Sequence, residues 1–84
     1  MKRIGVVGII VTNRESVGEL QSILSDYSDI IIGRMGVPIH EKQVNAISLI
    51  VCGENEKVSA LTGKIGRMPD INVKSALNSI TLDN

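Results

Sequence analysis

Two stretches of this chain, residues 3–12 and 45–52, place apolar side chains on both faces of an extended strand, and they constrain the fold more than any other feature. A strand that has one face in water carries a polar residue at every second position, whereas a strand covered on both faces does not. Both stretches are rich in β-branched residues, which favour strands. They are therefore predicted to be the central strands of a sheet.

Helical periodicity follows each of these strands. After the first strand, Asn13 offers an N-cap and Ser16 to Glu19 form a capping-box pattern. After the second, acidic residues flank Asn55, where they favour the start of a helix. The apolar residues that recur at spacings of three and four are Val17, Leu20, Ile23, Leu24 and Tyr27 in the first segment, and Val58, Leu61, Ile65 and Met68 in the second. Each central strand is thus followed by an amphipathic helix.

The remaining two strand segments have the features of edge strands. Residues 29–39 contain Gly33, Gly36 and Pro38, and proline cannot donate a hydrogen bond into a ladder, which indicates an irregular edge strand. Residues 72–82, preceded by Ile71, alternate between two faces of which one is apolar over most of its length. The pattern predicts an α+β fold, a ferredoxin-like βαββαβ sandwich. Its four-stranded antiparallel sheet has the order 4-1-3-2, with both helices on one face.

The size and composition of the chain predict one domain that assembles with copies of itself. With 84 residues there is room for a single core, here residues 1–84, and Tyr27 is the only aromatic residue. If both helices cover one face, the opposite face exposes aliphatic side chains to water. Each full side chain left exposed forgoes about 1.5–3 kcal/mol of hydrophobic free energy. Periodicity leaves open whether Val7, Ile9 and Val11 or the alternate set faces the helices. In either case we expect a homo-oligomer, a dimer or a tetramer, that covers the bare face.

Charge and cysteine content narrow the classes of partner. Nine basic and nine acidic residues give a formal net charge of +0, so neither direct DNA binding nor membrane association is expected. A single cysteine, Cys52, cannot form an internal disulfide, which is typical of the cytoplasm. The apolar run near the N-terminus is not followed by a small-residue cleavage site, so a strand is favoured over a signal peptide.

The loop after the first strand is the candidate binding site for a small molecule. Thr12 and Asn13 offer short hydrogen-bonding side chains, Arg14 offers a guanidinium, and the helix start offers free N–H groups. Together these groups favour a carboxylate or phosphate, such as that of an amino acid. The alternative is an ordinary capped turn, because every residue in the loop also has a capping role available.

Metal binding and catalysis have weaker candidates. His40 and Cys52 are the only histidine and cysteine, whereas a closed zinc or nickel site needs about four donors. A metal site is therefore expected only if subunits share it. No residue pattern in the sequence suggests a nucleophile, a general base or an oxyanion-stabilising donor. We therefore expect no enzymatic activity and no cofactor.

Two further segments, residues 33–38 (GRMGVP) and 59–67 (SALTGKIGR), carry a family resemblance together with RIGVVGIIVTNRE near the N-terminus. Over nearly its whole length the chain resembles the regulator family of the iron-only hydrogenase system, whose members are similar to ACT-type regulatory domains and to the C-terminal domain of the nickel-responsive repressor. The resemblance implies a βαββαβ fold, oligomers, and small effectors bound at subunit interfaces near the first βα loop. The chain lacks the histidine set of that repressor and any helix-turn-helix or ribbon-helix-helix segment, so neither nickel nor operator binding is carried over.

These observations predict a homo-oligomeric, small-molecule-sensing regulatory module that modulates an unidentified protein partner or a transcription event. The resemblance implies that it regulates an iron-only hydrogenase system. One alternative is a metal-responsive module with a site shared between subunits. A second is an acylphosphatase-type enzyme on the same fold. Arg14 lies near the place where such an enzyme needs an arginine, but the glycine-rich phosphate loop is missing.

Overall fold

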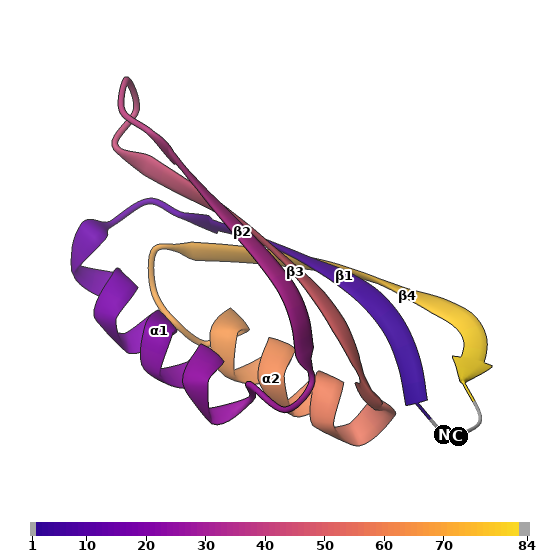
Figure 1. Ribbon diagram of the computed structural model, residues 1–84. Coiled ribbons are helices and arrows are strands. Elements are labelled where there is room, and N and C mark those ends of the chain that lie inside the picture. The colour runs from indigo at the N-terminus through magenta and orange to yellow at the C-terminus, as the bar shows by residue number, and fades with distance from the viewer. Residues whose placement is uncertain (1, 83–84) are drawn as a thin grey trace.

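The computed structural model, which describes residues 2–82 and gives 79–82 as backbone only, is a four-stranded antiparallel sheet with two helices on one face (Figure 1). The strand order is β2-β3-β1-β4, which is 4-1-3-2 read from the other edge. The predicted fold class and topology are confirmed. The elements in chain order are β1 (Lys2–Val11), the short 3-10 helix η1 (Arg14–Ser16), α1 (Val17–Asp26), β2 (Ile31–Ile39), β3 (Val44–Glu54), α2 (Asn55–Gly66) and β4 (Ile71–Leu82).

The structure decides which alternate set of side chains faces the helices. In β1 the odd-numbered residues Val7, Ile9 and Val11 are fully buried, and in β3 the odd-numbered residues Leu49 and Val51 join them. The antiparallel register pairs Ile9 with Ile47 and Val7 with Leu49, so the two sets lie on one face. The other core side chains come mainly from the helices and the turns beside them: Leu20, Leu24, Tyr27, Ile30, Val58, Leu61, Ile65 and Met68.

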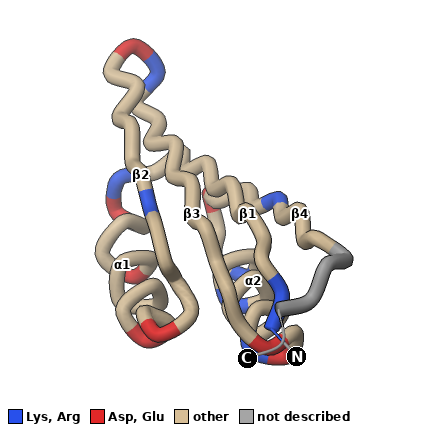
Figure 2. Tube along the Cα trace, turned by 45° about the vertical axis from the view of Figure 1, so that its right-hand side comes forward, with Lys and Arg blue, Asp and Glu red and all other residues tan. Residues whose placement is uncertain are grey.

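The opposite face of the sheet is equally apolar and has no covering layer. The even-numbered residues of β1 point to this side, and Val6 remains 45% exposed. Figure 2 shows that charged residues gather on the helices, at the strand ends and at the hairpin tip, and that the middle of the sheet carries few of them. We call this surface the open face. Its exposed large apolar side chains are Ile4, Val6, Ile10, Met35, Val37, Ile39 and Ile50.

The edge strand β2 is irregular, as its composition predicts. Ile31 pairs with Val51, but Gly33 pairs with Ile50, so Ile32 is an extra residue that shifts the register. Beyond this bulge, β2 and β3 continue as a hairpin that projects past the helices (Figure 1). The hairpin turn is held by two backbone hydrogen bonds, from Lys42 N–H to Ile39 O at 3.2 Å and from Gln43 N–H to His40 O at 3.4 Å.

The capping box predicted at the start of α1 is wrong. Asn13 does act as a cap, because its Oδ1 accepts a hydrogen bond from Glu15 N–H at 3.0 Å, but it caps η1. The short η1 helix leads directly into α1, which places Ser16 in the right-handed helical region at φ −80° and ψ −12°. A capping serine normally has extended backbone, and the Ser16 side chain makes no capping bond here.

Two glycines provide a matched test of the packing. A Cβ on Gly53 would lie 2.7 Å from Ile30 Cγ2, whereas a Cβ on Gly63, inside α2, would meet nothing within 4 Å. We expect Gly53→Ala to lower the free energy of unfolding by about 1–3 kcal/mol through overpacking. We expect Gly63→Ala to raise it by about 0.5–1 kcal/mol through helix propensity. Urea unfolding at one fixed protein concentration measures both, and shifts of the same sign would contradict this packing.

Candidate functional site

The loop after β1 is tied to the turn between α2 and β4. Thr12 donates two hydrogen bonds to the carbonyl oxygen of Asp70, from its backbone N–H at 2.9 Å and from its hydroxyl at 3.0 Å. Asn13 Nδ2 donates to the Asp70 carboxylate at 3.3 Å. Thr12 and Asn13 are therefore both engaged within the chain, and the carboxylate of Asp70 already occupies the amide donor of Asn13.

Asp70 itself adopts an uncommon backbone conformation. Its φ is 61°, in the left-handed region, which glycine, asparagine and aspartate tolerate better than other residues. This conformation turns the chain from α2 into β4 and presents the carbonyl oxygen that Thr12 binds. The contact joins the ends of β1 and α2, which are far apart in the sequence, and it fixes the position of the loop that carries Arg14.

Arg14 lies on the other side of this loop. It lines a surface hollow of about 380 Å³ between the start of α1 and the β2–β3 hairpin, which we call the hairpin hollow. The hollow is lined by Arg14, Val17, Pro38, Ile39, His40, Gln43, Val44 and Asn45. The three residues predicted to form one ligand site thus split, with Thr12 and Asn13 toward Asp70 and Arg14 toward the hairpin.

No pattern in the sequence indicates that His40, Gln43 and Asn45 share a site with Arg14. They belong to the hairpin, which is separated from the loop by the whole of α1. Only the strand order and the register, in which Val11 pairs with Asn45, bring them near the end of β1. The ligand site at Thr12, Asn13 and Arg14 stays a prediction.

The two candidate metal ligands lie at opposite ends of β3. His40 is in the hairpin loop before Val44, whereas Cys52 is near the other end of the strand, about 26 Å from Val44 at a rise of about 3.3 Å per residue. Cys52 has a free, half-buried thiol. Within residues 2–82 no three histidine, cysteine or acidic side chains come together as a metal site. The two residues could therefore meet at a metal only across two copies of the chain.

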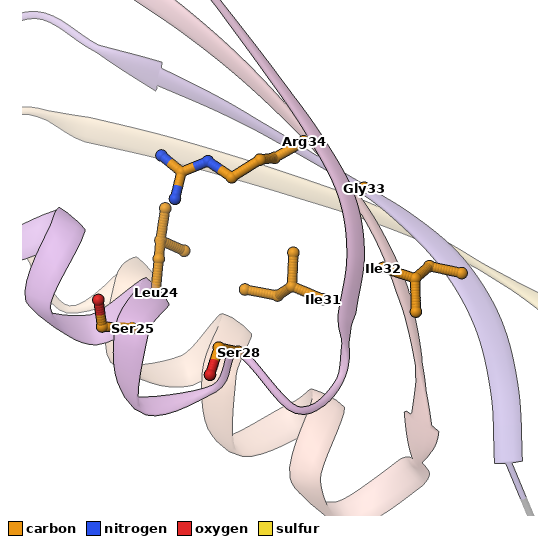
Figure 3. A pocket seen from close by; sticks show the side chains of 7 residues that line it. All are labelled: Leu24, Ser25, Ser28, Ile31, Ile32, Gly33 and Arg34. Carbon is orange, nitrogen blue, oxygen red and sulfur yellow. The ribbon is translucent and has the colours of Figure 1, made fainter.

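Two more hollows lie beside β2. On the open face, a shallow and largely apolar depression of about 300 Å³ lies over Gly8, between Ile10 and Met35 and beside Lys74. On the helix side, a hollow of about 310 Å³ separates α1 from the bulged start of β2 (Figure 3). In that view Ile31 points toward Leu24 of α1, and Ile32 points away from it. Arg34 spans this side and donates to Gln21 Oε1 at 2.8 Å.

One ion pair fastens the turn after α1 to the start of α2. Lys57 Nζ binds Asp29 Oδ2, and this hydrogen bond holds the pKa of the Asp29 carboxyl below its usual range. Both side chains are well exposed, so the pair is screened by water and salt. Neither residue lies in the hairpin hollow.

A small antiparallel sheet with two helices on one face defines an α+β domain of the ferredoxin-like type. Within that class, the chain belongs to the TM1266-like family. The model of this family, described as "Iron-only hydrogenase system regulator, putative", matches residues 3–75. The family resemblance that the sequence indicated is confirmed.

Solved structures agree with this assignment. The chain is similar to the uncharacterized protein TM1266 from Thermotoga maritima, with a TM-score of 0.88 and 27% identity over 92% of this chain and 98% of that one. It also shares its fold with the divalent ion tolerance protein CutA1 from Ehrlichia chaffeensis, with a TM-score of 0.50 and 16% identity over 99% of this chain and 88% of that one. No curated protein matches it in sequence. Neither helix among the described residues has the length and apolar character needed to cross a bilayer.

The conformation of Asp70 gives a test of how the loop is held. Asp70→Gly and Asp70→Ala both remove the carboxylate that binds Asn13, but only glycine tolerates a φ of 61° without strain. We expect the alanine variant to be less stable than the glycine variant by about 1 kcal/mol, as thermal unfolding would measure. Equal stabilities would show that the left-handed backbone does not contribute to holding the loop.

Proposed function

We propose that this chain is a homo-oligomeric regulatory module of the cytoplasm that senses a small molecule and acts on a protein partner of an iron-only hydrogenase system. Membership of a regulator family supports the regulatory role. The main support for a homo-oligomer is the open face, on which seven large apolar side chains from three strands remain exposed. Contiguous apolar patches of this kind mark interaction surfaces on soluble proteins.

The shape of the molecule supports a buried open face. The accessible surface is 5398 Å², whereas a compact monomer of 9.0 kDa has about 4,850 Å². The radius of gyration is 12.9 Å, against about 11.8 Å for a compact chain of 84 residues. The chain alone thus exposes roughly 550 Å² more than its mass requires, and association with a partner would remove such an excess.

The charge of the open face favours a second copy as its partner. Away from the strand ends, Lys74 is the charged side chain that accompanies the exposed aliphatic residues on this face. An apolar surface that carries little charge is complementary to itself, and two copies related by a two-fold axis would each cover the same residues of the other. Burying each half-exposed aliphatic side chain contributes roughly 1 kcal/mol, which offsets part of the entropy lost on association.

The small-molecule part of the proposal rests on Arg14. Among the described residues its guanidinium has no hydrogen-bond or ion-pair partner, whereas Thr12 and Asn13 are held by Asp70. We assign to Arg14 the contact with an anionic group of the effector, such as the carboxylate of an amino acid. Thr12 and Asn13 form the rest of the loop and set its position beside the subunit interface.

A charge placed on the open face tests the oligomer. Val6→Lys leaves the monomer's core intact, because Val6 lies on the face away from the helices, but it would bury a charge between copies. We expect the wild-type chain to sediment as a dimer or tetramer at micromolar concentration and Val6→Lys to shift it toward 9.0 kDa. Ser59→Lys, on the exposed side of α2, is the control and should leave the assembly unchanged. A wild-type chain that sediments only as a monomer would refute the oligomeric part of the proposal.

A thermal-shift screen of amino acids tests the effector. A ligand at about 100 times its dissociation constant stabilises the folded state by about 2.7 kcal/mol, and each kcal/mol raises the melting temperature by about 4–8 °C in a domain of this size. Arg14→Ala should abolish most of this shift and leave the unliganded melting temperature nearly unchanged, because the side chain is exposed and unpaired. An undiminished shift in the variant would place the effector elsewhere.

A further inference from the structure

The walls of the hairpin hollow come from two parts of the chain that the sequence does not connect. Arg14 stands on the loop after β1, and His40 stands across from it in the β2–β3 hairpin. These are the ionisable residues of the lining, and both are basic. No aspartate or glutamate lines the hollow, so its charge favours an anion.

The side chains of Arg14 and His40 make no hydrogen bond or ion pair with the rest of residues 2–82. Some other basic side chains of this domain do have partners within the chain. Arg34 binds Gln21, and the ammonium of Lys64 lies 5.1 Å from the centre of the Tyr27 ring. The side chains of Arg14 and His40 are thus available to a ligand, and the guanidinium of Arg14 can make charge-assisted hydrogen bonds, which are stronger than neutral ones.

The rest of the lining is apolar with two amides. Val17, Ile39 and Val44 provide aliphatic surface, while Gln43 and Asn45 provide hydrogen-bonding groups. A volume of about 380 Å³ is near the lower end of the range for small-molecule sites, about 300–1,000 Å³. The combination suits a compact molecule that has an anionic end and a short aliphatic body.

One residue of the hairpin that lines the hollow, Gln43, has an uncommon backbone conformation. Gln43 has a φ of 54°, in the left-handed region, although glycine or asparagine would adopt this conformation at lower cost. Left-handed residues occur in the loops of β-hairpins, where they turn the chain, and also at ligand sites. Here the strained residue is also part of the lining.

From these four observations we infer that the hairpin hollow binds a small carboxylate with a short aliphatic body, held between Arg14 and the hairpin residues Ile39, His40 and Gln43. The inference deepens the proposed function and rests on it for its regulatory meaning. It adds the hairpin as the second wall of the effector site and names the chemical class of the ligand.

The test is calorimetric titration with three probes of related shape. 3-Methylbutanoate has both the carboxylate and the branched body, 3-methylbutanamide lacks the charge, and acetate lacks the body. We expect the amide and acetate to bind at least 10-fold more weakly than 3-methylbutanoate. Equal binding of all three probes would overturn the inference.

Variants on the two walls locate the binding. Arg14→Gln, His40→Gln and Ile39→Ser should each weaken 3-methylbutanoate binding at least 5-fold, and these residues are exposed, so the fold should persist. Because Ile39 also belongs to the open face, Ile39→Ser is compared with the wild-type chain at a concentration where sedimentation shows the same assembly state for both. Gln43→Gly suits the left-handed backbone, and it should weaken binding without lowering the melting temperature. Lys74→Gln, beside the open-face depression over Gly8, is the control and should bind normally.

Different results would contradict the effector site at Arg14, which belongs to the proposed function, and the carboxylate site in the hairpin hollow. If Arg14→Gln loses binding but the three hairpin variants bind normally, the hairpin wall is wrong and the loop site of the proposed function stands. If 3-methylbutanoate does not bind at all while an amino acid still shifts the melting temperature through Arg14, the inferred ligand class is wrong. If Lys74→Gln alone loses binding, the ligand lies on the open face, and the inference is overturned.

Discussion

The packing of two helices against one side of a sheet that is apolar on both sides is the constraint on which this structure depends. The odd-numbered residues of β1 and β3 meet α1 and α2, and this layer contains most of the core. Close approach requires small residues, and Gly53 leaves the space that Ile30 fills. Because two short helices cover only one face, the even-numbered residues of the same strands remain in water. The core and the exposed surface thus follow from one arrangement.

The candidate site follows from the ends of the same strands. At one end of β1, Asp70 fastens the loop through Thr12 and Asn13, and this anchors Arg14 without engaging its guanidinium. The β2–β3 hairpin projects past the helices at the same end (Figure 1). It supplies His40, which lines the hairpin hollow together with Arg14. The proposed assembly would use the open face, and the proposed ligand site is the hairpin hollow beside it. The two surfaces meet at Ile39 of β2. A ligand that moves the hairpin would also move Met35, Val37 and Ile39 on the open face.

Much of this fold could be predicted from the sequence, because strand chemistry and strand position agree. The two segments that are apolar on both faces, residues 3–12 and 45–52, form the central strands β1 and β3. The segment interrupted by Gly33, Gly36 and Pro38 forms the edge strand β2. The alternate set that faces the helices could not be predicted, because both sets are aliphatic and periodicity distinguishes them only when one is polar. The capping box at Ser16 failed because a 3-10 turn, which has no clear sequence signal, continues into α1. The hairpin hollow was missed because register, a non-local property, brings Asn45 beside Val11.

The most direct test of the account is an isotope-filtered NOE experiment on a mixture of chains that carry ¹³C-labelled isoleucine methyl groups and unlabelled chains. If a second copy covers the open face, intermolecular NOEs are expected at Ile4, Ile10 and Ile50, which lie on that face, and none at Ile9 and Ile65, which lie under the helices. Absence of intermolecular NOEs at the open-face isoleucines, in a sample whose core isoleucines are assigned, would contradict the claim that a second copy covers this face.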